Sequence, residues 1–442
     1  MAQPNILILI TDQQTHAAMS CAGNEWLSTP AMDALAQRGT RFQRAYCTYP
    51  LCTPARASHM TGRYPHELEI YGNTGKIFWG HDFQNDQQMA GHFARAGYRC
   101  VWAGKDTPPA DGSRLFEVLC SHGDVKVGDR MTEFLRDPGE KPFLALANFV
   151  NPHNICEWAR EMPLWEGQFG QPPVESELPL LPANHAIPPY EPEILRVVQK
   201  AGMEIYLPRN YTPLQWRRYL WAYYRMVELV DRQIGRITRV LEENGLAQNT
   251  LVIFMSDHGD GCAAHRWNQK MTFYEEVIRV PMILAGPGVE AGRSCDGLVS
   301  TGLDLLPTCL AAAGVSIPAD LPGRSILDLC SGSKPSHWRE ELIVESALNP
   351  ESGNPARSLK RNVGRCIVTD RYKYSVWKWG HNRQQLVDLE ADPGEMVNLA
   401  AANRSDDVLE DLRSRLADWC RQTDDAFQVP GHEIFSPGAP RD

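Results

Sequence analysis

The sequence predicts an α/β fold: a large, mostly parallel sheet sandwiched by helices, followed by a smaller C-terminal α+β domain with an antiparallel sheet. Long apolar runs alternate with amphipathic segments of helical period, as in sheets covered on both faces. After about Gly332 the runs become short and are joined by turns. A chain of 442 residues has room for both units. We predict domains over residues 1–340 and 341–442.

Three apolar runs predict strands buried on both faces, and each run stops at polar residues. The runs are Asn5–Ile10, Phe143–Ala147 and Leu251–Met255. The polar residues that follow them include Asp12, Asn148, His153, Asp257 and His258. Open α/β sheets place their sites beyond the carboxyl ends of the strands. We therefore expect these side chains to converge.

Helices fill the sequence between the strands. The clearest one runs from about Pro213 to Asn244, where apolar residues repeat at helical spacing before Gly245. Between Glu157 and Asn210 the chain is rich in proline and lacks a clean period, which predicts a long surface excursion. Near the C-terminus, "DDVLEDLRSRLADWCRQ" predicts an amphipathic helix after the short strands.

The composition excludes some function classes. A formal net charge of −10 argues against a nucleic-acid partner, because binding a polyanion requires a basic face. The opening "MAQPNILILITDQQ" has no basic region before its short apolar run, and no run approaches the length of a membrane span. We expect no membrane partner and a cytoplasmic location, or a periplasmic one if a leader has been removed. The twelve cysteines are then expected to be free thiols.

The stretch "YPLCTPARASHMTGR" raises the question of what Cys52 does. Cys47 lies five residues before it, but this spacing matches no common zinc pattern, and a Cys47–Cys52 disulfide does not suit a reducing compartment. A nucleophilic thiol remains open, because the Thr53-Pro54 step suits the start of a helix, whose dipole would lower the pKa of Cys52. A buried structural cysteine remains open as well.

The same stretch resembles a known signature. "CTPARASHMTGR" is similar to the C-x-P-x-R and T-G-R motif of the type I sulfatases, in which the cysteine is oxidised to formylglycine by a formylglycine-generating or anaerobic sulfatase-maturating enzyme. Further blocks follow the family's order, among them "NILILITDQQ", "AGYRCVWAGK", "FVNPH", "LVIFMSDHGD" and "YEEVIRVPMILAGPG". The family belongs to the alkaline phosphatase superfamily. The resemblance implies a central mixed sheet between helices and a smaller C-terminal sheet domain.

The resemblance also implies one divalent metal ion, for which calcium is typical of sulfatases. Its ligands would be Asp12, Gln13, the modified Cys52, Asp257 and His258. Gln13 stands where many members have a second aspartate, and His258 stands where many have asparagine. Carboxylate and amide oxygens suit calcium, whereas an imidazole nitrogen favours a softer ion.

Four cationic residues match the family's catalytic positions alongside Cys52. They are Arg56, which would fix the modified side chain, and Lys105, His153 and Lys270, which would bind sulfate and handle protons. A sulfate ester needs such groups, because negative charge moves to the leaving oxygen in the transition state. Taken alone, each lysine would be read as a solvated surface residue.

One position departs from the sulfatase pattern. Where many sulfatases read G-K-x-H, this chain has Thr107, which can hydrogen-bond an oxyanion but cannot act as a base at neutral pH. Together with Gln13, His258 and Asn73, this pattern resembles the phosphonate monoester and phosphodiester hydrolases, with partial likeness to choline sulfatases. We include Thr107, Asn73 and Gln13 among the predicted substrate contacts.

Aromatic and polar residues could also line a sugar-binding mouth. They are Trp377, Trp379, His381 and Arg383 near the C-terminus, and Trp158 and Trp165 in the proline-rich excursion. Of these, Trp377 and His381 are our predicted substrate contacts. The alternative is that the tryptophans pack the two domains together.

The predicted function is that of a sulfuric ester hydrolase acting on a small-molecule or oligosaccharide sulfate, with a carbohydrate sulfate favoured. The alternatives are a phosphonate monoester or phosphodiester hydrolase of the same superfamily, and an inactive relative that binds sulfated glycans. The sugar, the sulfated position, exo or endo action and the oligomeric state stay open at this level.

Overall fold

The main sheet has eight strands in the order β5-β4-β6-β1-β7-β8-β2-β9. The computed structural model describes residues 3–73, 88–105, 115–164, 166, 168–201, 210–332, 337–348, 362–401 and 406–432. The strands of this sheet are β1 (Asn5–Asp12), β2 (Gly39–Phe42), β4 (Arg99–Gly104), β5 (Glu117–Cys120), β6 (Phe143–Pro152), β7 (Thr250–Ser256), β8 (Met282–Ala285) and β9 (Arg293–Cys295). Five neighbours, β5 to β7, run parallel, and β8 is antiparallel to β7 and β2. The predicted mixed, mostly parallel sheet is confirmed.

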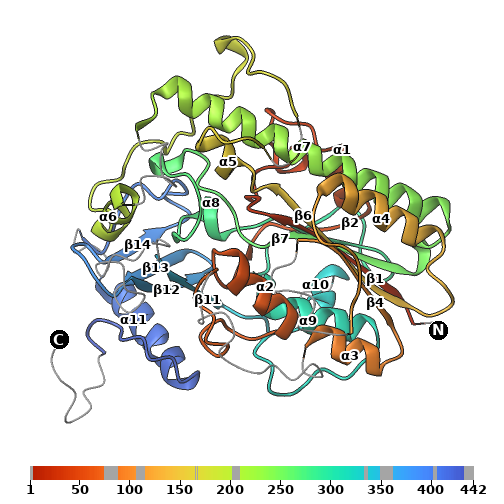
Figure 1. Ribbon diagram of the computed structural model, residues 1–442. Helices are drawn as coiled ribbons and strands as arrows, with labels where there is room; N and C mark the ends of the chain where they lie inside the picture. Colours follow the sequence, from red (N-terminus) through yellow and green to blue (C-terminus); the bar gives the residue numbers. More distant parts are fainter. Residues whose placement is uncertain are drawn as a thin grey trace.

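Helices cover both faces of this sheet (Figure 1). One face carries α1 (Pro30–Arg38), α4 (Asp124–Arg136) and α7 (Pro213–Glu243), and the other carries α2 (Cys52–Thr61), α3 (Met89–Arg95) and α9 (Thr301–Ala312). Strand β1 contributes side chains to the hydrophobic cores on both faces of the sheet, because successive side chains of a strand point to opposite faces. Ile8 packs in one core and Leu9 in the other, and both are fully buried.

The long helix is confirmed at α7. Its start is fixed by a capping box, in which the Thr212 hydroxyl accepts from the backbone of Gln215 and the Gln215 side chain accepts from the backbone of Thr212. The proline-rich excursion is less irregular than predicted, because it contains α6 (Glu193–Ala201). Ile194 and Val198 bury one face of α6. Two turns between prolines are too short for the helical period to stand out in the sequence.

A second, four-stranded antiparallel sheet follows, as predicted. Its strands, in spatial order, are β11 (Glu341–Ala347), β12 (Val363–Thr369), β13 (Tyr372–Trp377) and β14 (Gln384–Asp388). The amphipathic helix α11 (Asp406–Gln422) packs on it through Leu412 and Leu416.

The remaining elements are short. They are strands β3 (Ala45–Tyr46) and β10 (Val299–Ser300), which pair with each other, helices α5 (Ile155–Ala159), α8 (Glu275–Ile278) and α10 (Leu327–Cys330), and 3-10 turns at Ser20–Ala22, Glu175–Glu177, Ala247–Asn249 and Ala264–Arg266. All twelve cysteines are free, as predicted. Among the described helices, none has the length and apolar character needed to cross a bilayer.

A buried ion pair links the segment after α2 to the second sheet. The Nδ1 atom of His66 lies 2.6 Å from Oε1 of Glu345 on β11, and the backbone N–H of His66 donates to the other carboxylate oxygen at 3.1 Å. Burial lowers the pKa of His66, but the hydrogen bond and the charge of Glu345 outweigh it and raise the pKa to about 9. His66 is therefore charged in the folded protein at neutral pH.

This pair predicts a pH dependence of stability. The folded pKa of His66 lies above its ordinary value of 6.5, so the stabilisation is complete below pH 6.5 and is lost as the pH rises through 9. The loss should reach about 3 kcal/mol in the free energy of unfolding. Urea denaturation between pH 6 and 10 should show a flatter profile for Glu345→Gln than for the wild type. The exposed pair of His432 and Glu410 offers the control Glu410→Gln, whose profile should match the wild type. Equal slopes for all three proteins would contradict the assignment.

Candidate active site

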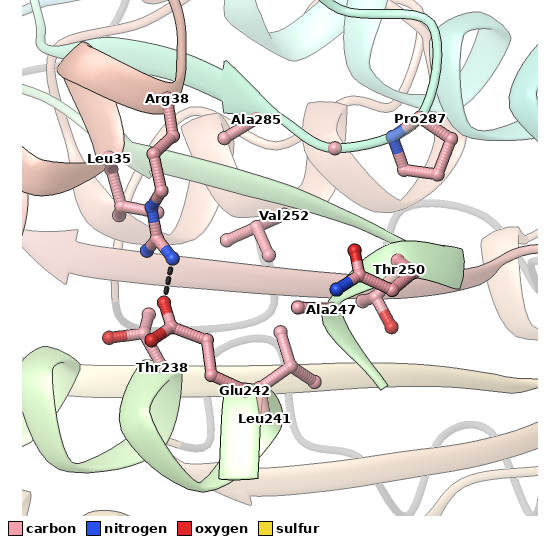
Figure 2. Close-up of a pocket in the computed structure, with 12 residues that line it drawn as sticks. Leu35, Arg38, Thr238, Leu241, Glu242, Ala247, Thr250, Val252, Ala285 and Pro287 are labelled. Carbon is pink, nitrogen blue, oxygen red and sulfur yellow. Dashed lines mark ion pairs between the residues drawn. The ribbon is translucent and has the colours of Figure 1, made fainter. Parts of the chain in front are cut away.

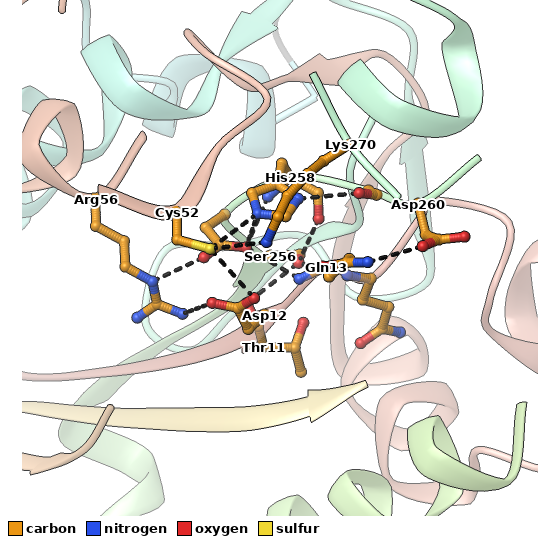
Figure 3. A network of polar contacts seen from close by, with 12 residues as sticks. Thr11, Asp12, Gln13, Cys52, Arg56, Ser256, His258, Asp260 and Lys270 are labelled. Carbon is orange, nitrogen blue, oxygen red and sulfur yellow. Dashed lines mark hydrogen bonds and ion pairs between the residues drawn. The ribbon is translucent and has the colours of Figure 1, made fainter. Parts of the chain in front are cut away.

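The polar ends of four adjacent parallel strands meet at one edge of the main sheet. Asp12 is the last residue of β1, Asp257 and His258 follow β7, Lys105 follows β4, and Asn148 lies on β6. Because these strands are neighbours and run in the same direction, their carboxyl ends point into one space. The structure thus brings these strand ends together, and Figure 3 shows Asp12 at the end of β1 close to His258 after β7.

Cys52 opens α2 and points into this space. Its Sγ atom lies 3.1 Å from Nζ of Lys270, 3.3 Å from Nε2 of His258 and 3.6 Å from Oδ1 of Asp12. Burial and Asp12 raise the pKa of the Cys52 thiol, but Lys105, Lys270 and His258 outweigh them and hold it well below its usual range. Only 2% of Cys52 is exposed, so its reactive atom faces the polar cluster and not bulk solvent.

Arg56, one turn further along α2, joins the two aspartates. Its Nε donates to Oδ2 of Asp257 at 2.7 Å, its Nη2 to Oδ2 of Asp12 at 3.2 Å, and its Nη1 to Oδ1 of Asn148 at 3.0 Å. The side chain is 2% exposed. A fork of donors of this kind fixes both carboxylates in place and compensates their buried charge.

Lys105 reaches the same carboxylate from β4, since its Nζ lies 2.5 Å from Oδ2 of Asp12. The close approach of β4 and β6 makes this possible. Gly104 has a φ of +99°, and a Cβ atom at this position would lie 1.9 Å from the carbonyl oxygen of Asn148. Burial raises the pKa of Asp12, but Lys105, His153, Arg56 and Lys270 outweigh it and lower that pKa well below its usual range.

Four side chains could hold one metal ion together. Asp12, Cys52, Asp257 and His258 each offer a ligand atom, all within 4.8 Å of one another, and all four are buried. Nδ1 of His258 faces the carbonyl oxygen of Gly259 at 2.9 Å, which leaves Nε2 directed at the cluster. Metal-bound histidines are commonly oriented in this way. Two carboxylates, an imidazole and residue 52 fit a divalent ion in their donor chemistry.

The predicted metal and substrate contacts of Gln13 are not supported by this arrangement. Its Nε2 donates to Oδ2 of Asp260 at 2.8 Å, and the Cys156 thiol approaches its Oε1 at 3.6 Å. Its backbone N–H donates to Oδ1 of Asp257 at 3.1 Å. Asp260 also accepts a hydrogen bond from the hydroxyl of Tyr219. Gln13 therefore supports Asp257, a candidate metal ligand, through its backbone, while its side chain binds the buried Asp260.

His153 and Lys270 stand beside Cys52 and Asp12. Burial, Lys270 and Lys105 lower the pKa of His153, whereas Asp12 and the Cys52 side chain act in the opposite direction. Burial lowers the pKa of Lys270, but Cys52 and Asp12 outweigh it and raise that pKa above its ordinary value. The site thus combines an imidazole and an ammonium group next to residue 52.

The other predicted contacts have different outcomes. Thr107 and Trp165 lie outside the described residues. Oδ1 of Asn73 accepts from the backbone N–H of Thr53 at 3.0 Å and so caps the first turn of α2, while a substrate contact of Asn73 stays a prediction. His381 is exposed, and its backbone pairs with Glu193 at the start of α6.

Trp377 requires a correction. It is 1% exposed, and its ring packs on Phe273 with the ring centroids 4.6 Å apart. The side chain belongs to the core between the main domain and the second sheet. The predicted role of Trp377 in lining a substrate mouth is wrong because no face of the ring is available to a ligand.

The sequence placed Asn148 at the converging strand ends but gave it no role, and the structure shows that it accepts a hydrogen bond from Arg56. Sequence reasoning missed Asp260 as part of the site. Asp260 gave no separate signal, because its side-chain partners Gln13 and Tyr219 are distant in sequence.

A separate cavity of about 510 Å³ lies at the opposite end of β7, near its first residue Thr250 (Figure 2). It is lined by residues of α1, α7, β7 and β8, and an ion pair between Arg38 and Glu242 crosses it. The cluster around Cys52 lies beyond Ser256, at the other end of the same strand. This cavity is therefore no part of the candidate active site.

Comparison with known proteins identifies the family. The sulfatase family model matches residues 4–315, and the model of the N-sulphoglucosamine sulphohydrolase C-terminal region matches residues 263–422. A Delta 4,5-hexuronate-2-O-sulfatase of Bacteroides thetaiotaomicron is 29% identical over 96% of this chain and 90% of its own length. The solved structure of a 2-O GAG sulfatase has a TM-score of 0.84 and 28% identity, and the similarity covers 99% of each chain.

A phosphonate monoester hydrolase from Silicibacter pomeroyi also has this fold, with a TM-score of 0.78 over 96% of each chain, but at 20% identity it shows the fold alone. The sulfatase family model covers more than half of the chain, and the strand-end cluster around Cys52 lies within the matched residues. The chain therefore belongs to the sulfatase family of enzymes.

Proposed function

We propose that this sulfatase removes a sulfate ester from a saccharide derived from a glycosaminoglycan, and that the preferred group is the 2-O-sulfate of a Δ4,5-unsaturated hexuronate. The Delta 4,5-hexuronate-2-O-sulfatase of Bacteroides thetaiotaomicron aligns with 96% of the chain at 29% identity. A second relative, an N-acetylglucosamine-6-O-sulfatase, is 25% identical over 90% of the chain. Both act on sulfated sugars, and the first shares more of the sequence.

The observation that carries the proposal is the arrangement around residue 52. Lys270 Nζ and His258 Nε2 lie within 3.3 Å of Sγ, and Lys105 Nζ contacts Asp12, whose other carboxylate oxygen faces Sγ. The two ammonium groups provide fixed positive charge where a sulfate group would react, whereas His258, as a metal ligand, would be neutral. Fixed donors of this kind stabilise the charge that develops on sulfate and leaving oxygens without reorganisation.

We propose further that Cys52 acts after oxidation to formylglycine. A divalent ion, for which calcium is our first choice, would be held by Asp12, Asp257, His258 and the modified residue 52. The hydrated aldehyde would supply an oxygen nucleophile, and the ion would acidify it. Arg56 holds the two aspartates in register. Lys105 would bind the sulfate oxygens, and either His153 or Lys270 would protonate the leaving alcohol. The maturating enzyme is then a required partner.

Substrate choice can be tested with defined esters. We expect sulfate release from a 2-O-sulfated Δ4,5-hexuronate disaccharide with a kcat/KM at least about 10²-fold above that for 6-O-sulfated N-acetylglucosamine, because misplacing the ester relative to fixed donors costs that much. Ion chromatography of released sulfate provides the measurement. A higher rate on the 6-O-sulfated sugar would contradict the uronate assignment.

The same assay separates the alternative chemistry. Phosphate monoester and phosphodiester analogues of one alcohol should be turned over more slowly than the matched sulfate ester. Dominant turnover of the phosphodiester would overturn the choice of substrate ester, whatever sugar is preferred.

A further inference from the structure

A second cluster of metal-ligating side chains lies outside the site described above. His265, Glu276 and Glu395 each offer a ligand atom, and these atoms lie within 4.8 Å of one another. The cluster shares no residue with the one around Cys52. We propose that these three residues bind a second divalent metal ion, which fastens the loop that carries Lys270 to the C-terminal domain.

Unused polar atoms in the cluster point to a missing ligand. His265 is fully buried, and its Nδ1 has no hydrogen-bond partner among the described residues. Its Nε2 has only a marginal contact of 3.5 Å with Nδ2 of Asn184. Oε2 of Glu276 is likewise shielded from solvent and has no partner there, while Oε1 accepts from Asn184 at 2.9 Å. Such buried groups are costly unless something binds them.

The local charge balance also favours a cation. Lys373 is shared between two carboxylates, with its Nζ 2.6 Å from Glu395 and 3.0 Å from Glu275. Arg279 approaches Glu275 at 3.8 Å. Glu276 has no ion-pair partner in the part of the chain that the structure describes. The carboxylates of Glu275, Glu276 and Glu395 therefore face two cations, Lys373 and Arg279. The carboxylate left without a compensating charge is that of Glu276.

The donor types indicate which ions fit. One imidazole nitrogen with two carboxylate oxygens is typical of sites for zinc or manganese, whereas calcium prefers six or more oxygen ligands. Three protein ligands leave room for water to complete the coordination. The expected ion at this cluster is thus Zn²⁺ or Mn²⁺, in contrast to the calcium proposed for the first site.

The position of the cluster gives the ion a structural task. The loop between β7 and α8 holds several non-glycine residues in the left-handed region, among them Ala263 at +65°, His265 at +53° and Gln269 at +68°. Each such residue costs energy unless its surroundings fix it. Lys270, which contacts Cys52, lies in this loop, and Glu395 lies in the turn after β14. An ion between His265 and Glu395 would hold the loop, and with it Lys270, against the C-terminal domain.

Metal stoichiometry of the whole protein tests the proposal. Chelator-stripped wild-type protein should be dialysed against Ca²⁺ together with Zn²⁺ or Mn²⁺, freed of unbound metal and analysed by elemental mass spectrometry. We expect the wild type to bind one Zn²⁺ or Mn²⁺ ion per chain beside the calcium ion of the first site, and Glu276→Gln to keep only the calcium ion. An anomalous difference peak between His265 and Glu395 would assign the second ion to this cluster. Absence of bound Zn²⁺ or Mn²⁺ in the wild type, or an anomalous peak elsewhere with none here, would overturn the proposal.

Two further variants complete the experiment. Glu390→Gln changes an exposed carboxylate of the same domain and should retain two ions. Asp12→Asn should lose the ion of the first site and keep the second, so failure of the active-site proposal can be told apart from failure of this one. If Glu276→Gln does not fold, the wild-type stoichiometry and the anomalous map still decide. Retention of two ions in a folded Glu276→Gln would contradict the assignment.

Discussion

Replacing Cys52 by alanine is expected to lower kcat/KM for sulfate ester hydrolysis by at least about 10⁴-fold, as loss of a nucleophile does in other hydrolases. Residue 52 is the point on which Lys270, His258 and Asp12 converge, so no neighbouring side chain can take over its position. Initial rates with a 2-O-sulfated hexuronate disaccharide, together with the melting temperature of the variant, provide the measurement.

Cys47 offers the matched control for this substitution. It is another buried free cysteine close in sequence, and its side chain belongs to the hydrophobic core and not to the polar cluster. Cys47→Ala should keep its activity within a few-fold of the wild type once it is folded. Substantial sulfate release by a folded Cys52→Ala enzyme would show that the chemistry does not depend on residue 52.

The second large effect is expected at Arg56. Arg56→Ala leaves Asp12 and Asp257 buried without their common partner, which should lower the free energy of unfolding by about 3–5 kcal/mol in the metal-free protein. The loss should be smaller in saturating Ca²⁺, because a bound ion would compensate the same carboxylates. Activity should fall as well, since both aspartates would lose their fixed orientation. Urea denaturation with and without Ca²⁺ measures the difference.

Two comparisons make this result interpretable. Arg56→Lys keeps a positive charge but loses the fork that reaches both aspartates and Asn148, so its stability should lie between those of the alanine variant and the wild type. Arg415→Ala removes a partly exposed pair with Glu341 and should cost no more than about 1 kcal/mol. If Arg56→Ala in the absence of metal were no more harmful than Arg415→Ala, the central role given to Arg56 would be wrong.

The strands of the main sheet could be predicted well from sequence, because burial on both faces makes each of them a continuous apolar run. The runs at β1, β6 and β7 end where the structure places Asp12, Asn148 and Asp257. Helix α6 could not be predicted in the same way. Its stability comes from packing of Ile194 and Val198 against the core, which two turns of sequence do not reveal.

The candidate site shows the same division. Residues tied to strand ends and to the start of α2 could be placed together, since topology alone brings them to one edge. Sheet topology does not predict in which direction an individual side chain points. Gln13 follows Asp12 directly, yet its amide turns to Asp260, and Trp377 lies near a domain boundary but is enclosed by Phe273 and its neighbours. Both outcomes depend on partners far away in sequence.

The most direct test of the proposed mechanism is the mass of the peptide from Tyr49 to Arg63, measured in several preparations of the enzyme whose specific activities differ. Conversion of Cys52 to formylglycine replaces the thiol by an aldehyde and lowers the peptide mass. The mechanism predicts that specific activity rises in proportion to the converted fraction and extrapolates to zero when residue 52 is entirely cysteine. Full activity in a preparation that carries only the thiol would contradict it.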